Sequence, residues 1–172
     1  MKRVANFRRS RDQRGFSLVE ILVSILVLAI GLLGLAGLQS KMLAAEMEAY
    51  QRSHAMILLE DMMNRIRADE DGARANAYDS IGSVNSNITE WKAALAGKSG
   101  DEVVGAMIGA QGCLASLATD PKTIRVSVAW QGLSPTAAPA SGDTCGQGKY
   151  GADDTLRRVV SGTVIILPPE EE

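Results

Sequence analysis

The most informative stretch of the sequence covers residues 16–38 and reads FSLVEILVSILVLAIGLLGLAGL. Its last 18 residues, 21–38, carry no charge. At a rise of about 1.5 Å per residue, a helix over the whole stretch crosses the roughly 30 Å hydrocarbon core of a bilayer. A chain this small cannot cover a helix that is apolar on every face, so a buried core helix is the weaker interpretation. The stretch therefore predicts a membrane-spanning helix.

Charge is distributed unevenly on the two sides of this stretch. Residues 1–15 hold six basic residues and one acid, whereas the rest of the chain holds 12 basic and 19 acidic residues. Basic flanks stay on the cytoplasmic side, so we expect the amino terminus inside and the chain from Gln39 onward outside. A phosphate-binding surface needs clustered Lys and Arg on the folded part, so no nucleic-acid partner is expected.

Two other N-terminal signals fit less well. A secretory signal could be cut near Ala44 and Ala45, but no break follows the apolar run. Arg8 and Arg9 could belong to a twin-arginine signal, but the apolar run is more hydrophobic than such signals usually are.

Glu20 is the charged residue within residues 16–38. A carboxylate in hydrocarbon is costly without a partner, so such a residue indicates a functional position. The alternative is a glutamate at the level of the lipid headgroups, favoured by the positive end of the helix dipole. Glu20 is therefore a candidate site residue.

Residues 13–20 read QRGFSLVE, with basic residues before them and the apolar run after them. This pattern resembles the class III signal of type IV pilins and pseudopilins. The resemblance implies that a prepilin peptidase cuts after Gly15 and that Phe16 becomes the N-methylated first residue. It also implies an assembly role for Glu20, because the new ammonium group of one subunit could neutralise this carboxylate in a neighbour.

Apolar residues continue at spacings of three and four beyond residue 38, which predicts one long helix to about residue 70. We expect its outer half to lie against a periplasmic head domain through one stripe: Leu43, Met47, Tyr50, His54, Ile57, Leu58, Met62 and Ile66. The expected domains are a cleaved leader (1–15), the long helix (16–70, with the transmembrane segment at 16–38) and an α/β head (71–172).

The head is expected to combine a short helix with a small antiparallel sheet. Residues 69–72 (DEDG) end the long helix and open a loop, and residues 87–96 predict a short helix with Thr89 as its cap. A short strand is expected around residues 113–117. Alternating apolar residues over 124–131 predict a strand whose partner is 156–167, with a bulge at Gly162. The predicted fold class is α+β.

Cys113 and Cys145 are the two cysteines, and both are expected outside the membrane, where thiols tend to be oxidised. A disulfide between them would close about 33 residues and stabilise the fold by roughly 3–4 kcal/mol. It resembles the stapled carboxy-terminal region of many pilins. Two free thiols are the alternative.

No enzyme activity, metal site or cofactor is expected. The chain has one histidine, and its cysteines and histidine lack metal-ligand spacing. Residues 146–151 (GQGKYG) match a GxGxxG pattern, but a strand rather than a helix is expected after them, so a loop is the better interpretation.

Within the pilin superfamily, residues 15–39, 59–67 and 128–130 resemble the PilV (type IV pilus modification protein) family. The resemblance implies a minor pilin that primes pilus assembly with other minor pilins, the major pilin, a tip adhesin and the inner-membrane assembly platform. The implied location is the inner membrane, single pass with a periplasmic head, and then the pilus at the cell surface. The alternatives are a minor pseudopilin of a type II secretion system and, in another class, a membrane-anchored periplasmic binding or sensor module.

Overall fold

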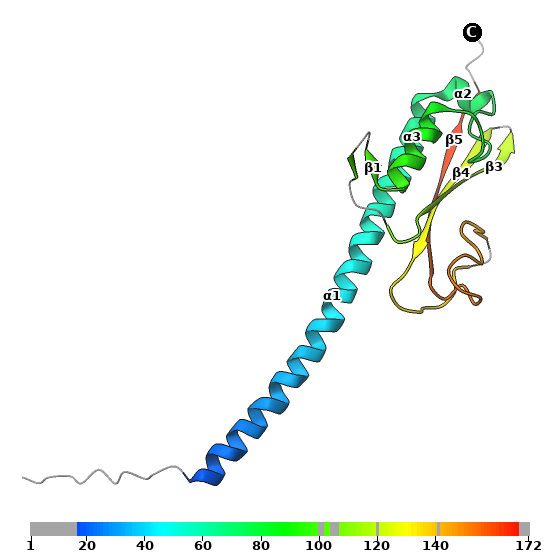
Figure 1. The fold of residues 1–172 in the computed structure, drawn as a ribbon. Helices are drawn as coiled ribbons and strands as arrows, with labels where there is room; N and C mark the ends of the chain where they lie inside the picture. Colours follow the sequence, from blue (N-terminus) through cyan, green and yellow to red (C-terminus); the bar gives the residue numbers. More distant parts are fainter. Residues whose placement is uncertain (1–16, 100–101, 104–106, 120, 141, 169–172) are drawn as a thin grey trace, which may run out of the picture. The chain divides into compact units, whose positions relative to one another are not determined.

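A computed structural model describes residues 17–99, 102–103, 107–119, 121–140 and 142–168. Gly15 and Phe16, the expected processing residues, lie outside these ranges. The chain divides into two compact units, Met1–Leu43 and Ala44–Glu172. The second is called the C-terminal unit below. Figure 1 shows the elements, which are α1 (Leu18–Ala68), α2 (Glu70–Arg74), α3 (Ser86–Leu95), β1 (Lys98–Ser99), β2 (Glu102–Val103), β3 (Gln111–Thr119), β4 (Lys122–Gln131) and β5 (Arg157–Ile166).

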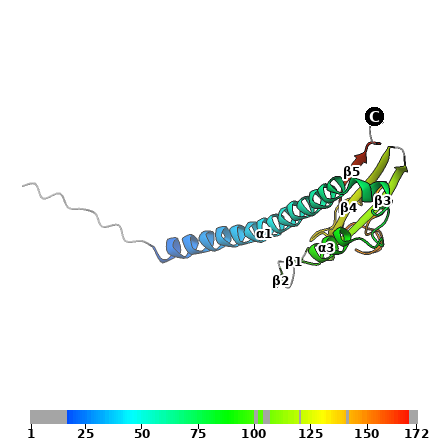
Figure 2. The same cartoon turned by 90° about the horizontal axis from the view of Figure 1, so that it is seen from above.

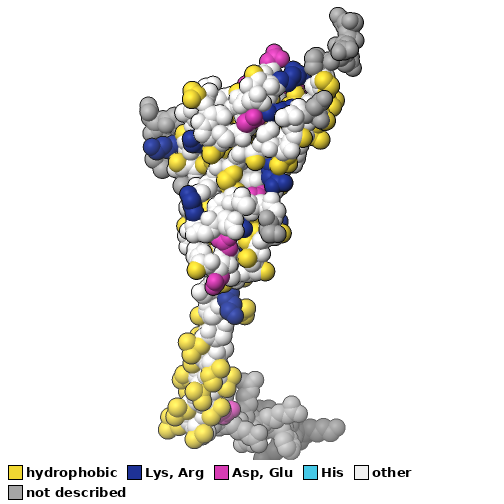
Figure 3. Space-filling model, turned by 90° about the vertical axis from the view of Figure 1, so that its right-hand side faces the viewer, with side chains coloured by type: hydrophobic (Ala, Val, Ile, Leu, Met, Phe, Trp, Pro, Cys, Tyr) yellow, Lys and Arg dark blue, Asp and Glu magenta, His cyan; other side chains and the backbone are white. Residues whose placement is uncertain are grey.

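The first unit, where it is described, is the apolar beginning of α1. All side chains from Leu18 to Leu43 are exposed, and apolar side chains gather over this part of the helix (Figure 3). The helix is long and apolar enough to cross a membrane. Because no protein surface covers these side chains, lipid or other helices are the surroundings that suit them.

Residues 44–68 of α1 provide the helical side of the core in the C-terminal unit. The buried face of the helix consists of Gln51, Ala55, Leu58, Leu59, Met62 and Ile66. The predicted stripe is therefore correct for Leu58, Met62 and Ile66 but wrong for Leu43, Met47, Tyr50 and Ile57, which are exposed. The helix carries two apolar stripes, one buried and one exposed. Both repeat every three or four residues, so the spacing of the apolar residues does not distinguish them.

The sheet has the strand order β3-β4-β5, and both pairs are antiparallel. The predicted partner strands are confirmed. The predicted bulge at Gly162 is wrong, because the β4–β5 register runs without a break through the Val126–Gly162 pair, and the irregularity lies in β3 between Ser116 and Ala118. Gly162 instead makes room for α1: a Cβ there would lie 2.5 Å from Met63 Sδ.

The short helix α3 lies on the same side of the sheet as α1. Gly112 of β3 pairs with Val128 and faces α3, since a Cβ at Gly112 would lie 2.4 Å from Trp91 Cζ3. Gly162 faces α1 and pairs with Val126, which shares a sheet face with Val128. Figure 2 shows both helices beside the sheet. The α+β class, with a long N-terminal helix packed on a small antiparallel sheet, is confirmed.

The starts of the helices differ in detail from the prediction. Asn85 caps α3, because its side chain accepts a hydrogen bond from the Asn87 amide (2.8 Å), so the prediction of Thr89 as the cap is wrong. Thr89 lies one turn inside the helix and donates to the Asn85 carbonyl (3.0 Å). The long helix ends at Ala68, as expected, but Asp69 then caps the short helix α2 rather than opening a loop directly.

Candidate functional site

Glu20 lies in the first turn of α1, where the free amide groups of the helix favour a negative charge. Its side chain is exposed, and in the part of the chain that is described its carboxylate has no hydrogen-bond or ion-pair partner. Ser24, one turn later, donates to the Glu20 backbone carbonyl (2.7 Å) and leaves the carboxylate free. The charge of Glu20 is therefore available to a partner from outside this chain.

A second exposed feature is the outer stripe of α1 in the C-terminal unit. Met47, Tyr50 and Ile57 are each at least half exposed, and Tyr50 stacks on His54 with ring centroids 6.1 Å apart. These residues repeat at spacings of three and four on the helix face away from the core. Such an uncovered apolar stripe is typical of a surface that packs against another helix.

The opposite face of the sheet carries the disulfide loop, defined here as residues 132–156. Cys113 in β3 is bonded to Cys145 in this loop, so the expected disulfide is present, with Cα atoms 5.8 Å apart. Cys113 pairs with Ser127 of β4, whereas its neighbours Gly112 and Leu114 pair with Val128 and Val126 on the helix-facing side. Cys113 therefore points to the other side of the sheet. Figure 1 shows the later, orange part of this loop on the side of the sheet away from α1. The disulfide thus adds a third layer to the fold.

Asp143 fixes the loop beside the disulfide. One of its carboxylate oxygens accepts a hydrogen bond from the Ser127 hydroxyl (2.6 Å), and the other accepts one from the Cys145 amide (2.9 Å). A single carboxylate therefore connects β4 to the chain that carries the bonded cysteine. Sequence reasoning did not single out Asp143; an Asp two residues before a loop cysteine is a local turn signal that could have pointed to it.

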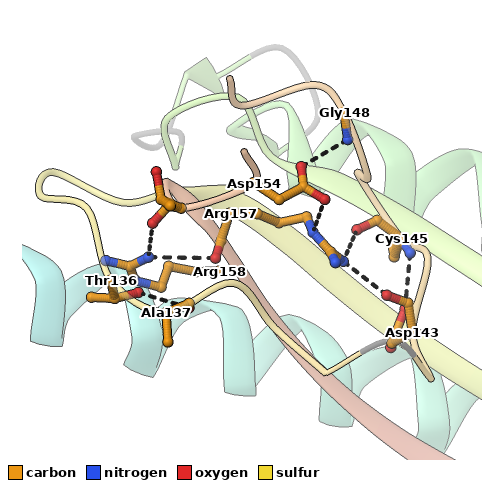
Figure 4. Close-up of polar contacts among 9 residues, drawn as sticks. Thr136, Ala137, Asp143, Cys145, Gly148, Asp154, Arg157 and Arg158 are labelled. Atoms are coloured by element: carbon orange, nitrogen blue, oxygen red, sulfur yellow. Dashed lines mark hydrogen bonds and ion pairs between the residues drawn. The ribbon is translucent and has the colours of Figure 1, made fainter. Parts of the chain in front are cut away.

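Arg157, at the start of β5, is the buried cation of this layer. Its Nη1 donates to the carbonyl oxygens of Asp143 (2.8 Å) and Cys145 (3.1 Å), and its Nε lies 3.2 Å from Asp154 Oδ2 (Figure 4). Asp154 also accepts from the Gly148 amide (2.8 Å). Arg157 thus holds the middle of the loop, at Asp143 and Cys145, beside its last residues at Asp154. Sequence reasoning missed Arg157 because a single charged residue at a strand start has no distinctive spacing.

Arg158 points to the other side of β5, as alternation along a strand requires. Its Nε donates to Glu48 of α1 (2.6 Å), and its Nη2 donates to the Ser134 carbonyl at the start of the disulfide loop (2.7 Å). The consecutive residues Arg157 and Arg158 therefore form contacts on opposite faces of the sheet. Together they connect β5 to α1, to the start of the disulfide loop at Ser134 and to its middle at Asp143 and Cys145.

Tyr150 closes the loop against the segment before β3. Its hydroxyl donates to the Gly109 carbonyl (2.6 Å), and its ring packs with Ala129 and Cys145. Burial raises the pKa of the Tyr150 hydroxyl above its ordinary value of 10.0, and the positive charge of Arg157 opposes part of this rise.

The raised pKa of Tyr150 predicts a loss of stability in alkali. The folded state favours the neutral hydroxyl, so its stabilising effect is complete below pH 10.0 and disappears as the pH rises through the folded-state pKa. We expect the free energy of unfolding, measured by urea denaturation of the detergent-solubilised chain, to fall as the pH rises above about 10. Tyr150→Phe should reduce that fall, although Tyr78, whose pKa burial also raises, keeps part of it. An identical pH dependence in the variant would contradict this assignment.

Among the residues that the structure describes, no group of three or more His, Cys, Asp or Glu side chains could hold a metal ion. GQGKYG, residues 146–151, lies in the disulfide loop, where Gly146, Gly148 and Gly151 adopt positive φ angles. The loop interpretation of this stretch is confirmed.

Comparison with known proteins gives one match. Residues 10–36 match the family model of the prokaryotic N-terminal methylation motif. This range contains Gly15, Phe16 and Glu20 and runs into α1. No curated protein and no solved structure gave a match.

The motif and the fold together define a class of protein. A prokaryotic N-terminal methylation motif in front of a long apolar helix, with the helix packed on a small antiparallel sheet, indicates a type IV pilin-like or prepilin-type protein. Within that class, the motif supports a pilin or pseudopilin that is processed by a prepilin peptidase and anchored in the membrane by its apolar helix.

Proposed function

We propose that the chain is a minor pilin of a type IV pilus that helps to prime pilus assembly together with other minor pilins. The match of residues 10–36 to the N-terminal methylation motif carries this proposal. The uncovered apolar start of α1 and the free carboxylate of Glu20 support a subunit whose helix packs among other helices. The resemblance of residues 15–39, 59–67 and 128–130 to the PilV family favours a pilus over a secretion system.

The proposed life cycle has two stages. The chain is first a single-pass inner-membrane protein with a cytoplasmic leader (1–15) and a periplasmic head (71–172), joined by the helix 16–70. The prepilin peptidase then cuts after Gly15 and methylates Phe16. The processed subunit joins other minor pilins, the major pilin, a tip adhesin and the assembly platform, and it reaches the cell surface with the pilus.

Glu20 has a defined role in this proposal. A carboxylate inside a bundle of apolar helices needs a positive partner, and the ammonium group of a processed neighbouring subunit supplies one. The side chain therefore favours insertion of a subunit in the correct register, whereas a subunit without the carboxylate leaves the ammonium of its neighbour unpaired.

Replacing Glu20 tests the proposal. In cells that lack the chromosomal copy, the wild-type chain should restore surface pili, and Glu20→Ala should be processed at Gly15 yet fail to restore them. Glu46→Ala is the matched control, because Glu46 is an exposed glutamate on α1 outside the motif. Pili counted by electron microscopy and chain detected in sheared pilus fractions give the result.

Three outcomes would count against the proposal. Full piliation with Glu20→Ala would show that pilus assembly does not need the carboxylate. Normal piliation in cells without the chain would remove the priming role. Loss of protein secretion with normal pili would assign the chain to a type II secretion system instead.

A further inference from the structure

A small cavity lies inside the C-terminal unit between α1 and the start of β5. Its volume is about 160 Å³, and it is lined by Glu48, Arg52, Trp130, Arg158, Val159 and Val160. The cavity is partly open to solvent, and none of its lining residues belongs to the N-terminal motif. Its wall contains both apolar surface and charged groups.

Of the charged side chains on this wall, Glu48 and Arg158 are paired with each other, whereas Arg52 is not paired within the described ranges. Glu48 is paired with Arg158 (2.6 Å), and Arg158 uses its other donors on the backbone carbonyls of Ser134 and Thr155. Arg52 lies one turn after Glu48 on α1, yet it forms no ion pair or side-chain hydrogen bond with any residue that the structure describes. The cavity therefore has one guanidinium in excess, and this guanidinium is exposed.

The tryptophan on this wall also lacks a hydrogen-bond acceptor for its indole N–H. Trp130 is buried (2 % exposed), and its Nε1 has no hydrogen-bond partner among the described residues. A buried donor without an acceptor destabilises the fold, so an acceptor that reached it would be bound favourably. By contrast, the other tryptophan, Trp91, donates its Nε1 to the Leu58 carbonyl (2.8 Å). Arg52 and Trp130 thus line the same small space, the first with a cation that has no partner and the second with an indole whose N–H has no acceptor in the described part of the chain.

Size and charge together select the ligand. Pockets for nucleotides and other drug-sized molecules measure about 300–1,000 Å³, so this cavity admits only a small group. One excess positive charge matches a monoanion, and the planar guanidinium fork fits the two oxygens of a carboxylate. The apolar side chain of Val160, which is on the α1 side of β5, suits the one or two methylene groups behind such a carboxylate.

We propose that this cavity binds a single carboxylate group, held by the Arg52 guanidinium next to the Trp130 indole. The carboxylate can come from an acidic side chain of another protein chain or from a small free carboxylate. Binding itself does not depend on the function proposed above, because it uses only residues of the C-terminal unit.

Acetate is the minimal probe. The full chain, labelled with ¹⁵N-tryptophan and held in a non-ionic detergent, should show two indole N–H signals, one from each tryptophan. Titration with sodium acetate, against sodium chloride at the same ionic strength, should move the Trp130 signal to saturation and leave the Trp91 signal in place. Arg52→Gln should weaken the apparent affinity at least about tenfold.

Arg67→Gln is the matched control, because Arg67 is another exposed arginine on α1 and contacts Asn64 rather than the cavity. It should leave the titration unchanged. A Trp130 signal that does not move, that moves without saturating, or that responds equally in Arg52→Gln would overturn the proposal. An unchanged Trp91 signal in every variant shows that the core has stayed folded.

A second measurement separates the two sources of the carboxylate. If another pilus subunit supplies it, Arg52→Gln should lower the amount of chain in sheared pili while Arg67→Gln does not. If the variant enters pili normally but has lost acetate binding, the ligand is a free carboxylate. This arm rests on the proposed function, whereas the acetate titration does not, so failure of one can be told from failure of the other.

Discussion

Replacing Trp91 by alanine should lower the free energy of unfolding by about 3–5 kcal/mol, the range typical of a large aromatic side chain removed from a core. Trp91 is fully buried, and it packs against Gly112 of β3. Its Nε1 donates to the Leu58 carbonyl in α1, so one side chain connects α3, the sheet and the long helix. Urea denaturation of the detergent-solubilised chain, followed by near-UV circular dichroism, measures the loss.

Two further variants show where this energy comes from. Trp91→Phe keeps much of the buried apolar surface and removes the hydrogen bond, so it should cost less than Trp91→Ala. Val84→Ala is the surface control, because Val84 is fully exposed and its replacement should change stability by less than about 0.5 kcal/mol. Equal stability of Trp91→Ala and the wild type would contradict the packing described here.

Removing the disulfide should have the second large effect. The bond joins positions 32 residues apart. Its loss should lower the free energy of unfolding by roughly 3–4 kcal/mol, because the unfolded chain would no longer be restricted by the cross-link. The double variant Cys113→Ser and Cys145→Ser should lose this stability and should also loosen the loop. Urea denaturation gives the energy, and limited proteolysis at residues 132–156 gives the loosening.

Reduction of the wild-type protein is the control for that variant. It should reproduce both effects and leave the double variant unchanged. If reduced and oxidised protein unfold at the same urea concentration, the hydrogen bonds of Asp143 and Arg157 hold the loop without help from the disulfide.

Much of the fold could be predicted because strong local patterns agree with the tertiary structure. The uncharged run at residues 21–38 requires a long apolar helix, and the alternation at Ile124, Val126 and Val128 requires a strand that places these side chains on one face. The processing motif is equally local, since Gly15, Phe16 and Glu20 lie within six residues. Such features depend on few long-range contacts.

Other features depend on contacts that spacing does not encode. Gly162 suggested a bulge, yet the structure uses it as space for Met63 of α1. The two apolar stripes of α1 have the same period, and only the packed sheet distinguishes Met62 from Ile57. Arg157 and Arg158 are adjacent in sequence, and their separate roles come from the alternation of β5 between two layers.

The most direct test of the central claim is the intact mass of the chain extracted from membranes of cells with and without the prepilin peptidase. A prepilin-type subunit should lose residues 1–15 and gain one methyl group on Phe16 only when the peptidase is present. A full-length chain in cells that contain the peptidase would contradict the account and leave a membrane-anchored module with an uncut leader.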